Sequence, residues 1–395
     1  MTSRPTSDLD LTEPEFLRDP YPALAALRAT APMVWHERSG MWWATTHAAV
    51  SAVLRERALG RLWTDRRPAE RFEPFNTLHR NQMMENEPPV HTRLRRLVAA
   101  AFARGHVERM RPRVHRLAVE LLDAADPAGF DLIGDYAEPL PVAVIADMLG
   151  VPAADRPLLR DWSQAIVRMY EYDRSPELEQ AALAASTEFA AYVRAMVAER
   201  RFRPGEDLVS HLIAAQDEGG RLTDEELVAS VVLLLNAGHE ASVNAFGNGL
   251  HALLSRPDQR SRLTSGEVAV AVAVEELLRF DAPLQLFERT AARDVEVAGL
   301  RLAAGDTVAA LMGSANRDAA VFAEPDALDV SRDPNPHVGF GMGVHFCLGA
   351  PLARMELSVS LAVLLERHPR LRLAGESHRR PTFVLRGYEH LPVAA

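Results

Sequence analysis

The sequence predicts a mainly α-helical protein with small β patches, an α+β architecture. Two long stretches, 91–125 and 139–255, are rich in Ala, Leu, Arg and Glu, with apolar residues three to four apart, as in amphipathic helices. Short alternating segments occur toward both ends of the chain. With 395 residues, 48% of them hydrophobic and 25% charged, the composition is that of a globular protein, which excludes disordered and low-complexity classes.

The predicted strands are short and separated by turns. We expect them in three regions, namely 32–46, 294–312 and 371–393. The first region turns at Ser39 and Gly40, and the second turns at Gly299 and Gly305. The third alternates like a small final hairpin.

The rest of the chain contains no linker that would divide it. A helix is expected over 47–57, followed by an irregular segment over 58–90 that is rich in Arg, Pro, Asn and Phe. The Pro-Gly pair at 204–205 and the Gly-Gly pair at 219–220 predict short turns between helices. We therefore expect one domain over 1–395.

One helix stands out by its length. Thr223 as N-cap and Glu226 three residues later form a capping box, and the apolar pattern then continues for about 30 residues, a rod of roughly 48 Å. Ala237 and Gly238 lie near its middle. Because Gly costs about 1 kcal/mol relative to Ala inside a helix, this small pair indicates that another group approaches closely there.

The only cysteine, Cys347, lies in the glycine-rich segment 340–349 (FGMGVHFCLG), ahead of a predicted helix over 350–365. A thiolate held in such a loop at a helix N-terminus is a good metal ligand. A lone cysteine is also often a small buried hydrophobe. A nucleophilic cysteine, as in a hydrolase, is a further reading, although His345 is too close in sequence to face it well.

The pattern F-G-x-G-x-H-x-C-x-G resembles the haem-binding signature of the bacterial cytochrome P-450 superfamily, the haem-thiolate monooxygenases. The resemblance implies a triangular helical domain with the long central helix over the haem. It implies haem b as cofactor, with the Cys347 thiolate as axial metal ligand, favouring O–O cleavage. Phe340 and Gly349 would then contact the cofactor.

Three further motifs in the family's order extend the resemblance from about residue 85 to the C-terminus. The first, Glu276-Leu-Leu-Arg279, would otherwise be an ordinary surface helix pair. It resembles the family's E-x-x-R pair, which is buried and structural, and Arg332 could be its third member.

The second motif, Glu87 to Arg95, supplies cations for the haem propionates. His91 and Arg95 lie four residues apart, on one helix face. The resemblance implies that both contact the propionates, together with Arg289 and His345. Charge-assisted hydrogen bonds would offset the two carboxylates.

The third motif, Ala237 to Ser242 in the long helix, resembles the segment that crosses the haem at the oxygen site. Ala237 and Gly238 leave room for dioxygen, and Glu240 matches the acid in proton delivery. The family's usual Thr is replaced by Ala241. Ser242 carries a hydroxyl but points about 100° away around the helix.

The missing hydroxyl at Ala241 leaves three routes open. The substrate's own hydroxyl or carboxyl could supply the hydrogen bond, or an ordered water held by Glu240 or Ser242 could do so. Alternatively, the reaction could be aromatic or peptide side-chain coupling or cyclisation without oxygen insertion. His239 is expected to face away from the iron.

The resemblance also implies the partners. We expect a ferredoxin and its reductase, dioxygen, and a small organic substrate, free or carrier-bound, such as an intermediate of secondary metabolism. Residues 91–113 carry seven Arg against one Glu, a basic patch that could receive an acidic ferredoxin or simply solubilise a helix. A non-catalytic haem sensor is the remaining alternative.

Charge and hydropathy set the expected location. The formal net charge of −10 argues against nucleic acid as a partner. The N-terminus shows no signal peptide, and no apolar run reaches the ~20 residues of a membrane span. We expect a cytoplasmic monomer.

The substrate-binding residues are the least defined. The resemblance gives candidates from the 58–84 loop, from 162–173 and from the long helix: Leu62, Trp63, Phe72, Phe75, Met83, Met84, Ile166, Met169, Tyr170 and Leu233. It adds the segments 284–287 and 383–388. Arg66, Arg67 and Arg71 could receive a carboxylate or simply be solvated. Trp63 and the phenylalanines could instead be core or lid packing residues.

Overall fold

The computed structural model describes residues 4–126, 128–217 and 222–394. The chain divides into two compact units. Unit 1 comprises Met1–Gly60, Ala118–Ala137 and Ala241–Ala395, and unit 2 comprises Arg61–Leu117 and Glu138–Glu240. Two helices, α6 (Arg104–Ala124) and α11 (Asp224–Leu254), run from one unit into the other. The expectation of a single domain stays a prediction.

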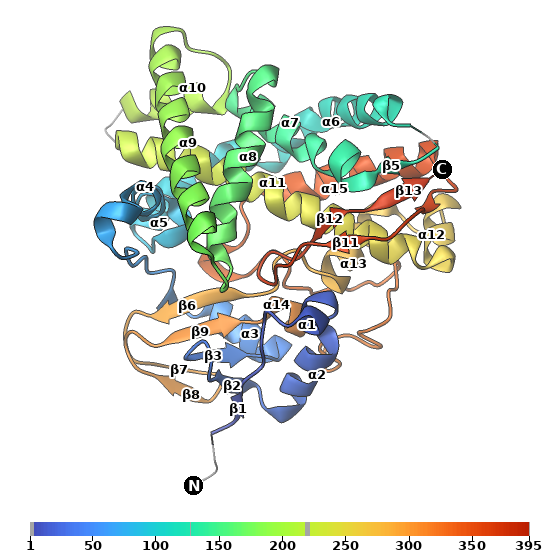
Figure 1. Cartoon of the computed structure of the whole chain (residues 1–395), viewed down its shortest axis with the longest axis horizontal. Coiled ribbons are helices and arrows are strands. Elements are labelled where there is room, and N and C mark those ends of the chain that lie inside the picture. Colours follow the sequence, from blue (N-terminus) through green and yellow to red (C-terminus); the bar gives the residue numbers. More distant parts are fainter. Residues whose placement is uncertain (1–3, 127, 218–221, 395) are drawn as a thin grey trace. The chain divides into compact units, whose positions relative to one another are not determined.

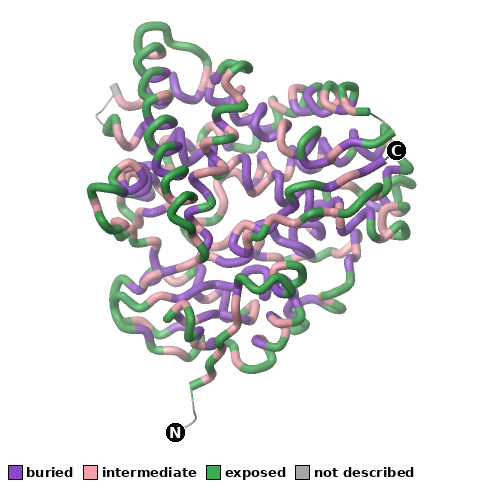
Figure 2. Tube along the Cα trace, viewed as in Figure 1, coloured by how far each residue is buried: buried purple, intermediate pink, exposed green. Residues whose placement is uncertain are grey.

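Unit 1 contains the main sheet, whose strand order is β1-β2-β3-β9-β6-β4 (Figure 1). Its strands are β1 (Thr6–Ser7), β2 (Met33–His36), β3 (Met41–Ala44), β4 (Leu59–Gly60), β6 (Phe287–Ala291) and β9 (Thr307–Ala310). Trp43, Val308 and Ala309 are fully buried, and Figure 2 shows β3 and β9 as buried segments. The sheet and the adjoining helix α3 (His47–Arg55) form an aliphatic core.

The sheet confirms two predicted strand regions and adds a strand. β2 and β3 form the antiparallel hairpin predicted around Gly40. Within 294–312, β7 (Val295–Val297), β8 (Leu300–Leu302) and β9 confirm the second region. The prediction missed β6, because FERTA carries two charged residues and no apolar alternation. Its pairing with β9 stabilises it as a strand.

The remaining elements of unit 1 are helices and small sheets. They are α1 (Pro14–Arg18), α2 (Tyr21–Thr30), β5 (Phe130–Asp131), η3 (Leu132–Ala137), α12 (Pro257–Thr264), α13 (Val270–Phe280), α14 (Met312–Ala315), η6 (Gly343–His345), α15 (Ala350–Arg367), β10 (Arg372–Leu373), β11 (His378–Arg379), β12 (Tyr388–His390) and β13 (Pro392–Ala394). The predicted C-terminal hairpin is confirmed by the antiparallel pairs β10·β13 and β11·β12. Leu250, Leu277 and Leu361 line a small apolar hollow shared by α11, α13 and α15.

Unit 2 is helical. It contains α4 (Ala69–Arg80), η1 (Met83–Glu85), α5 (Val90–Ala99), η2 (Ala100–Phe102), α7 (Pro139–Leu149), η4 (Ala153–Asp155), α8 (Arg156–Val167), η5 (Arg168–Tyr170), α9 (Pro176–Phe202) and α10 (Leu208–Asp217). The prediction that 58–90 is irregular was wrong for α4. Its internal Pro74 favoured an irregular segment in the prediction, because proline is rare inside helices. In the structure, however, Phe72, Phe75 and His79 are buried at helical spacing on one face.

Helix α11 begins as its sequence predicts. The Glu226 carboxylate accepts a hydrogen bond from the Thr223 backbone N–H (2.9 Å), and the Thr223 hydroxyl accepts one from the Glu226 N–H (3.1 Å). By length and composition alone α11 could cross a membrane, but 83% of its most apolar window is buried inside the protein, as in a core helix. Gly219 and Gly220, predicted to form a turn before it, lie outside the described residues.

Together, the two units confirm the predicted class, mainly α with small β patches.

Candidate active site

The only thiol of the chain lies in a tight loop at the start of a helix. Gly341 and Gly343 adopt φ values of +68° and +70°, which other residues rarely adopt, so glycine is required for this turn. The Cys347 backbone N–H donates to the Phe340 carbonyl (2.9 Å) and closes the loop. Cys347 is partly accessible, and α15 begins three residues later. A Cβ at Gly349 would lie 3.9 Å from the Cys347 Sγ.

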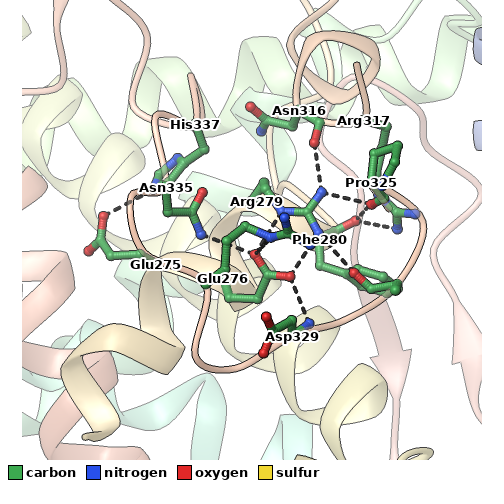
Figure 3. Close-up of polar contacts among 12 residues, drawn as sticks. Glu275, Glu276, Arg279, Phe280, Asn316, Arg317, Pro325, Asp329, Asn335 and His337 are labelled. Atoms are coloured by element: carbon green, nitrogen blue, oxygen red, sulfur yellow. Dashed lines mark hydrogen bonds and ion pairs between the residues drawn. The ribbon is translucent and has the colours of Figure 1, made fainter. Parts of the chain in front are cut away.

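Behind this loop, Arg279 forms the predicted buried ion pair with Glu276. The guanidinium binds both carboxylate oxygens, at 2.7 Å and 2.8 Å, and both side chains are fully buried. Its remaining N–H groups donate to the carbonyls of Asn316, Pro325 and Ala327 (Figure 3). All five donors of the guanidinium are therefore paired.

The Glu276 carboxylate connects α13 to the segment that precedes the Cys347 loop. It accepts hydrogen bonds from the Asp329 N–H (2.9 Å), Arg332 Nε (3.1 Å) and Asn335 Nδ2 (3.0 Å) (Figure 3). Arg332 is thus the third member of the cluster, as predicted. We refer to Glu276, Arg279, Arg332 and Asn335 as the Glu276 network.

Unit 1 also holds the predicted cofactor contacts other than those on α5 and α11. Arg289 lies on β6 opposite Val308 of β9, with only 2% of its surface exposed, and its guanidinium stacks on Phe287. Phe340, His345 and Gly349 belong to the Cys347 loop and are half-buried.

Unit 2 holds the other predicted propionate cations. His91 is buried and Arg95 is half-buried, one turn apart on α5. His91 and Arg95 belong to unit 2, whereas Arg289 and His345 belong to unit 1. Contact of all four with one cofactor stays a prediction.

The central segment of α11 differs in accessibility from the rest of the helix. Residues 227–236 and 243–250 are buried, whereas Ala237 is exposed and Gly238, Ala241 and Ser242 are half-buried. Their spacing places these four residues on one side of the helix. Glu240 is buried, with 2% of its surface exposed. A helix that carries small accessible residues within an otherwise buried span can accept a flat group along its surface.

His239 occupies a different side of this segment. Its ring is fully buried, with Nδ1 3.5 Å from the Ser163 hydroxyl and 3.7 Å from a Glu240 carboxylate oxygen. The expectation that it faces away from the iron stays a prediction.

These residues fit a haem. A partly accessible cysteine in a loop that needs glycine offers a soft thiolate ligand. Within unit 1, Arg289 on β6 is buried and His345 lies in the Cys347 loop, and both side chains carry N–H donors that suit carboxylates.

Several predicted substrate contacts belong to an aromatic cluster in unit 2, which we call the His79 cluster. His79 stacks between Phe75 and Trp63, with ring centroids 3.8 Å and 4.8 Å away, and its Nε2 lies 3.0 Å from the Tyr170 hydroxyl. Phe72, Ile166 and Met169 are buried packing residues.

Two of the candidate arginines, one before α4 and one on it, make polar contacts within unit 2. Arg66 Nη2 donates to the Met169 carbonyl (3.1 Å), and Arg71 pairs with Glu179 at 3.0 Å. Arg67 is exposed.

Comparisons with known proteins identify the family. A family model described as Cytochrome P450 matches residues 164–273 and 269–370. The cytochrome P450 monooxygenase PikC of Streptomyces venezuelae is 38% identical over 402 residues, covering 99% of this chain and 94% of the relative. This chain belongs to the cytochrome P450 family. It is an enzyme, a haem-dependent oxidoreductase of the monooxygenase class.

Further relatives support this P450 assignment. Nocardicin C N-oxygenase of Nocardia uniformis subsp. tsuyamanensis is 41% identical over 388 residues, covering 95% of this chain and 94% of the relative. The crystal structure of P450BioI with a hexadec-9Z-enoic acid ligated acyl carrier protein matches with a TM-score of 0.92 at 33% identity, covering 96% of this P450 and 99% of that chain. The predicted P450 fold class is confirmed.

Three residues near the Cys347 loop were missed by the sequence analysis. His337 and Arg354 both contact Glu275, although 62 to 79 residues separate Glu275 from these partners. No motif spacing connects such distant positions, and Glu275 is hidden beside the motif residue Glu276.

Proposed function

We propose that this P450 is a ferredoxin-fed monooxygenase of a small organic substrate, with the Cys347 thiolate as axial ligand of haem b. The observation that carries the proposal is the single accessible cysteine in a glycine-dependent loop, held between the Glu276 network and α15. Bound haem would supply dioxygen activation and oxidation of the substrate. Arg289, His345, His91 and Arg95 would hold its carboxylates.

The residues of α11 would control the proton supply. Glu240 is a buried acid adjacent to the accessible residues Ala241 and Ser242, which lack the family's threonine. A substrate hydroxyl or carboxyl, or a water held by Glu240 or Ser242, would donate the hydrogen bond in its place. Gly238 and Ala237 leave space on the same side for dioxygen.

Replacing Ala241 by Thr tests this proton supply. We expect product formed per reductant consumed to stay unchanged or fall. A second variant, Ser242→Ala, removes the neighbouring hydroxyl and should lower this ratio where Ser242 holds the water. A large rise in coupling in the Ala241→Thr variant would contradict substrate- or water-assisted proton delivery.

A second candidate is coupling or cyclisation without oxygen insertion, which Ala241 favours. One structural neighbour with a TM-score of 0.88 is the P450 CxnD, described as forming a C–S bond. Turnover under isotope-labelled dioxygen separates the two candidates. Label in the product supports insertion, and a dehydrogenated or coupled product without label supports the second candidate.

The redox partner and the carrier question also belong to this proposal. On α5 and α6, Arg96, Arg104 and Arg109 are exposed, whereas Arg111 and Arg113 pair with Glu108 and Asp147. The exposed arginines offer a basic surface to an acidic ferredoxin. The carrier-bound ligand of the P450BioI structure makes a carrier-bound substrate worth testing beside free secondary metabolites. We propose a cytoplasmic monomer.

A further inference from the structure

Three charged or polar side chains meet at the base of the Cys347 loop. Arg354 of α15 donates to both carboxylate oxygens of Glu275 of α13, from Nε at 2.6 Å and from Nη2 at 2.8 Å. His337, in the segment before the loop, lies with Nε2 3.0 Å from the same carboxylate (Figure 3). Such a two-bond pairing between guanidinium and carboxylate fixes orientation as well as distance.

The hydrogen bonds of His337 define its protonation. Its Nδ1 accepts a hydrogen bond from the Gly339 backbone N–H at 3.1 Å, so the ring hydrogen lies on Nε2 and is donated to Glu275. Through this ring, the Glu275 carboxylate holds the backbone immediately before Phe340.

Phe340 transmits these contacts to the cysteine. The Arg354 guanidinium lies 4.4 Å from the centre of the Phe340 ring, and the His337 ring lies 5.9 Å from it. The Phe340 carbonyl accepts the Cys347 N–H. Arg354, on α15, lies seven residues after Cys347 in the sequence. Both ends of the loop are therefore tied to one carboxylate.

This cluster differs from the adjacent Glu276 network. Glu276 and Arg279 are fully buried and hold the segments around 316–335, whereas the side chains of Glu275 and Arg354 are 26% and 38% exposed. Ion pairs at such exposure add little to overall stability. We therefore expect the cluster to fix the geometry of the loop and to add little to the stability of the fold.

We propose that Glu275, Arg354 and His337 form a clamp, a set of positioning residues that fixes the orientation of Phe340 and, through it, of the Cys347 thiolate. This inference rests on the proposed ligation of haem by Cys347. When the clamp is broken, the loop backbone at Phe340 and Cys347 gains freedom, so the thiolate is held less uniformly and the midpoint potential shifts.

The test compares three variants with a matched control. Arg354→Met removes the pairing and the stacking, Arg354→Lys keeps the charge but not the two-bond geometry, and Glu275→Gln keeps the shape but removes the charge. Arg367→Met is the control, because Arg367 lies on the same helix and pairs with the exposed Asp123. The readouts are the thiolate-type fraction of the ferrous–CO spectrum, the midpoint potential, and amide hydrogen exchange of segment 337–349 in haem-free protein.

We expect Arg354→Met to lower the thiolate-type fraction at least twofold and to speed exchange of 337–349 several-fold, with Glu275→Gln changing in the same direction. Arg354→Lys should recover part of the loss, and Arg367→Met should match the wild type. Wild-type spectra, potential and exchange in both Arg354→Met and Glu275→Gln would overturn the clamp. A wild-type protein without any thiolate-type band would instead overturn the proposed haem ligation, and the exchange measurement would still judge the clamp.

Discussion

The Glu276 network of unit 1 and the His79 cluster of unit 2 both bury polar side chains, the first as an ion pair and the second as a neutral histidine. Glu276 and Arg279 bury charges, and these are fully satisfied by each other and by backbone carbonyls. His79 is buried among aromatic rings, and burial lowers its pKa to about 4, so it is neutral at pH 7. Its Nδ1 donates to the Phe75 carbonyl (2.8 Å), and its Nε2 accepts from the Tyr170 hydroxyl.

The difference has consequences for behaviour. Removing one partner of a buried ion pair is strongly destabilising, because the other charge is left buried without compensation. A neutral buried histidine loses its stabilising effect when acid supplies a proton. We therefore expect mutation to affect unit 1 most at the Glu276 network, and pH to affect unit 2 most at the His79 cluster.

The largest expected effect is that of Glu276→Gln. It leaves the buried Arg279 and the half-buried Arg332 without their counter-charge, which costs about 3–5 kcal/mol of unfolding free energy. Urea unfolding and haem content of the purified protein measure the loss. Glu267→Gln, which breaks an exposed pair with Arg262, is the control and should change nothing measurable. Equal stability of the two variants would remove the contrast on which the comparison rests.

An intermediate effect is expected from pH. The pKa of His79 in the folded protein, about 4, lies below the value of about 6.5 in an unfolded chain, so its contribution is complete above pH 6.5 and is lost as pH falls toward 4. At pH 5.5 the loss is about 1 kcal/mol. His79→Gln should abolish this part of the pH dependence. If wild type and variant lose stability in parallel between pH 7 and 5, His79 is not the responsible group.

The smallest expected effect tests whether burial or charge makes the difference. Arg93 of unit 2 pairs with Glu226 (3.0 Å), but its side chain is 34% exposed. Arg93→Gln should cost at most about 1 kcal/mol, because a solvated pair contributes little. A loss of unfolding free energy as large as that of Glu276→Gln would show that charge pairing alone, without burial, determines the size of the loss.

What the sequence could predict depends on how far apart the interacting residues lie along the chain. Glu276, Arg279 and Arg332 were predicted because a family motif marks them, and the capping box of α11 was predicted because its partners are three residues apart. The hairpin of β2 and β3 followed from alternation around a glycine turn. Each of these signals is local or carries a fixed pattern.

The rest depends on contacts between distant positions. Strand β6 exists through its pairing with β9, and α4 through the burial of Phe72, Phe75 and His79, so neither has a clear local pattern. Trp63 and Tyr170 both pack against His79, a contact between distant positions that no local pattern marks, and their contact with substrate stays a prediction. Glu275 and Arg354 lie 79 residues apart and share no motif.

Ligation of haem by Cys347 is tested most directly by the ferrous–CO spectrum of the wild-type protein beside that of Cys347→Ser. We predict a thiolate-type Soret band in the wild type and its loss in the variant, since Cys347 is the only thiol in the chain. A thiolate-type band that survives in Cys347→Ser, or a wild-type protein that purifies without haem and does not take it up on reconstitution, would contradict haem ligation by Cys347.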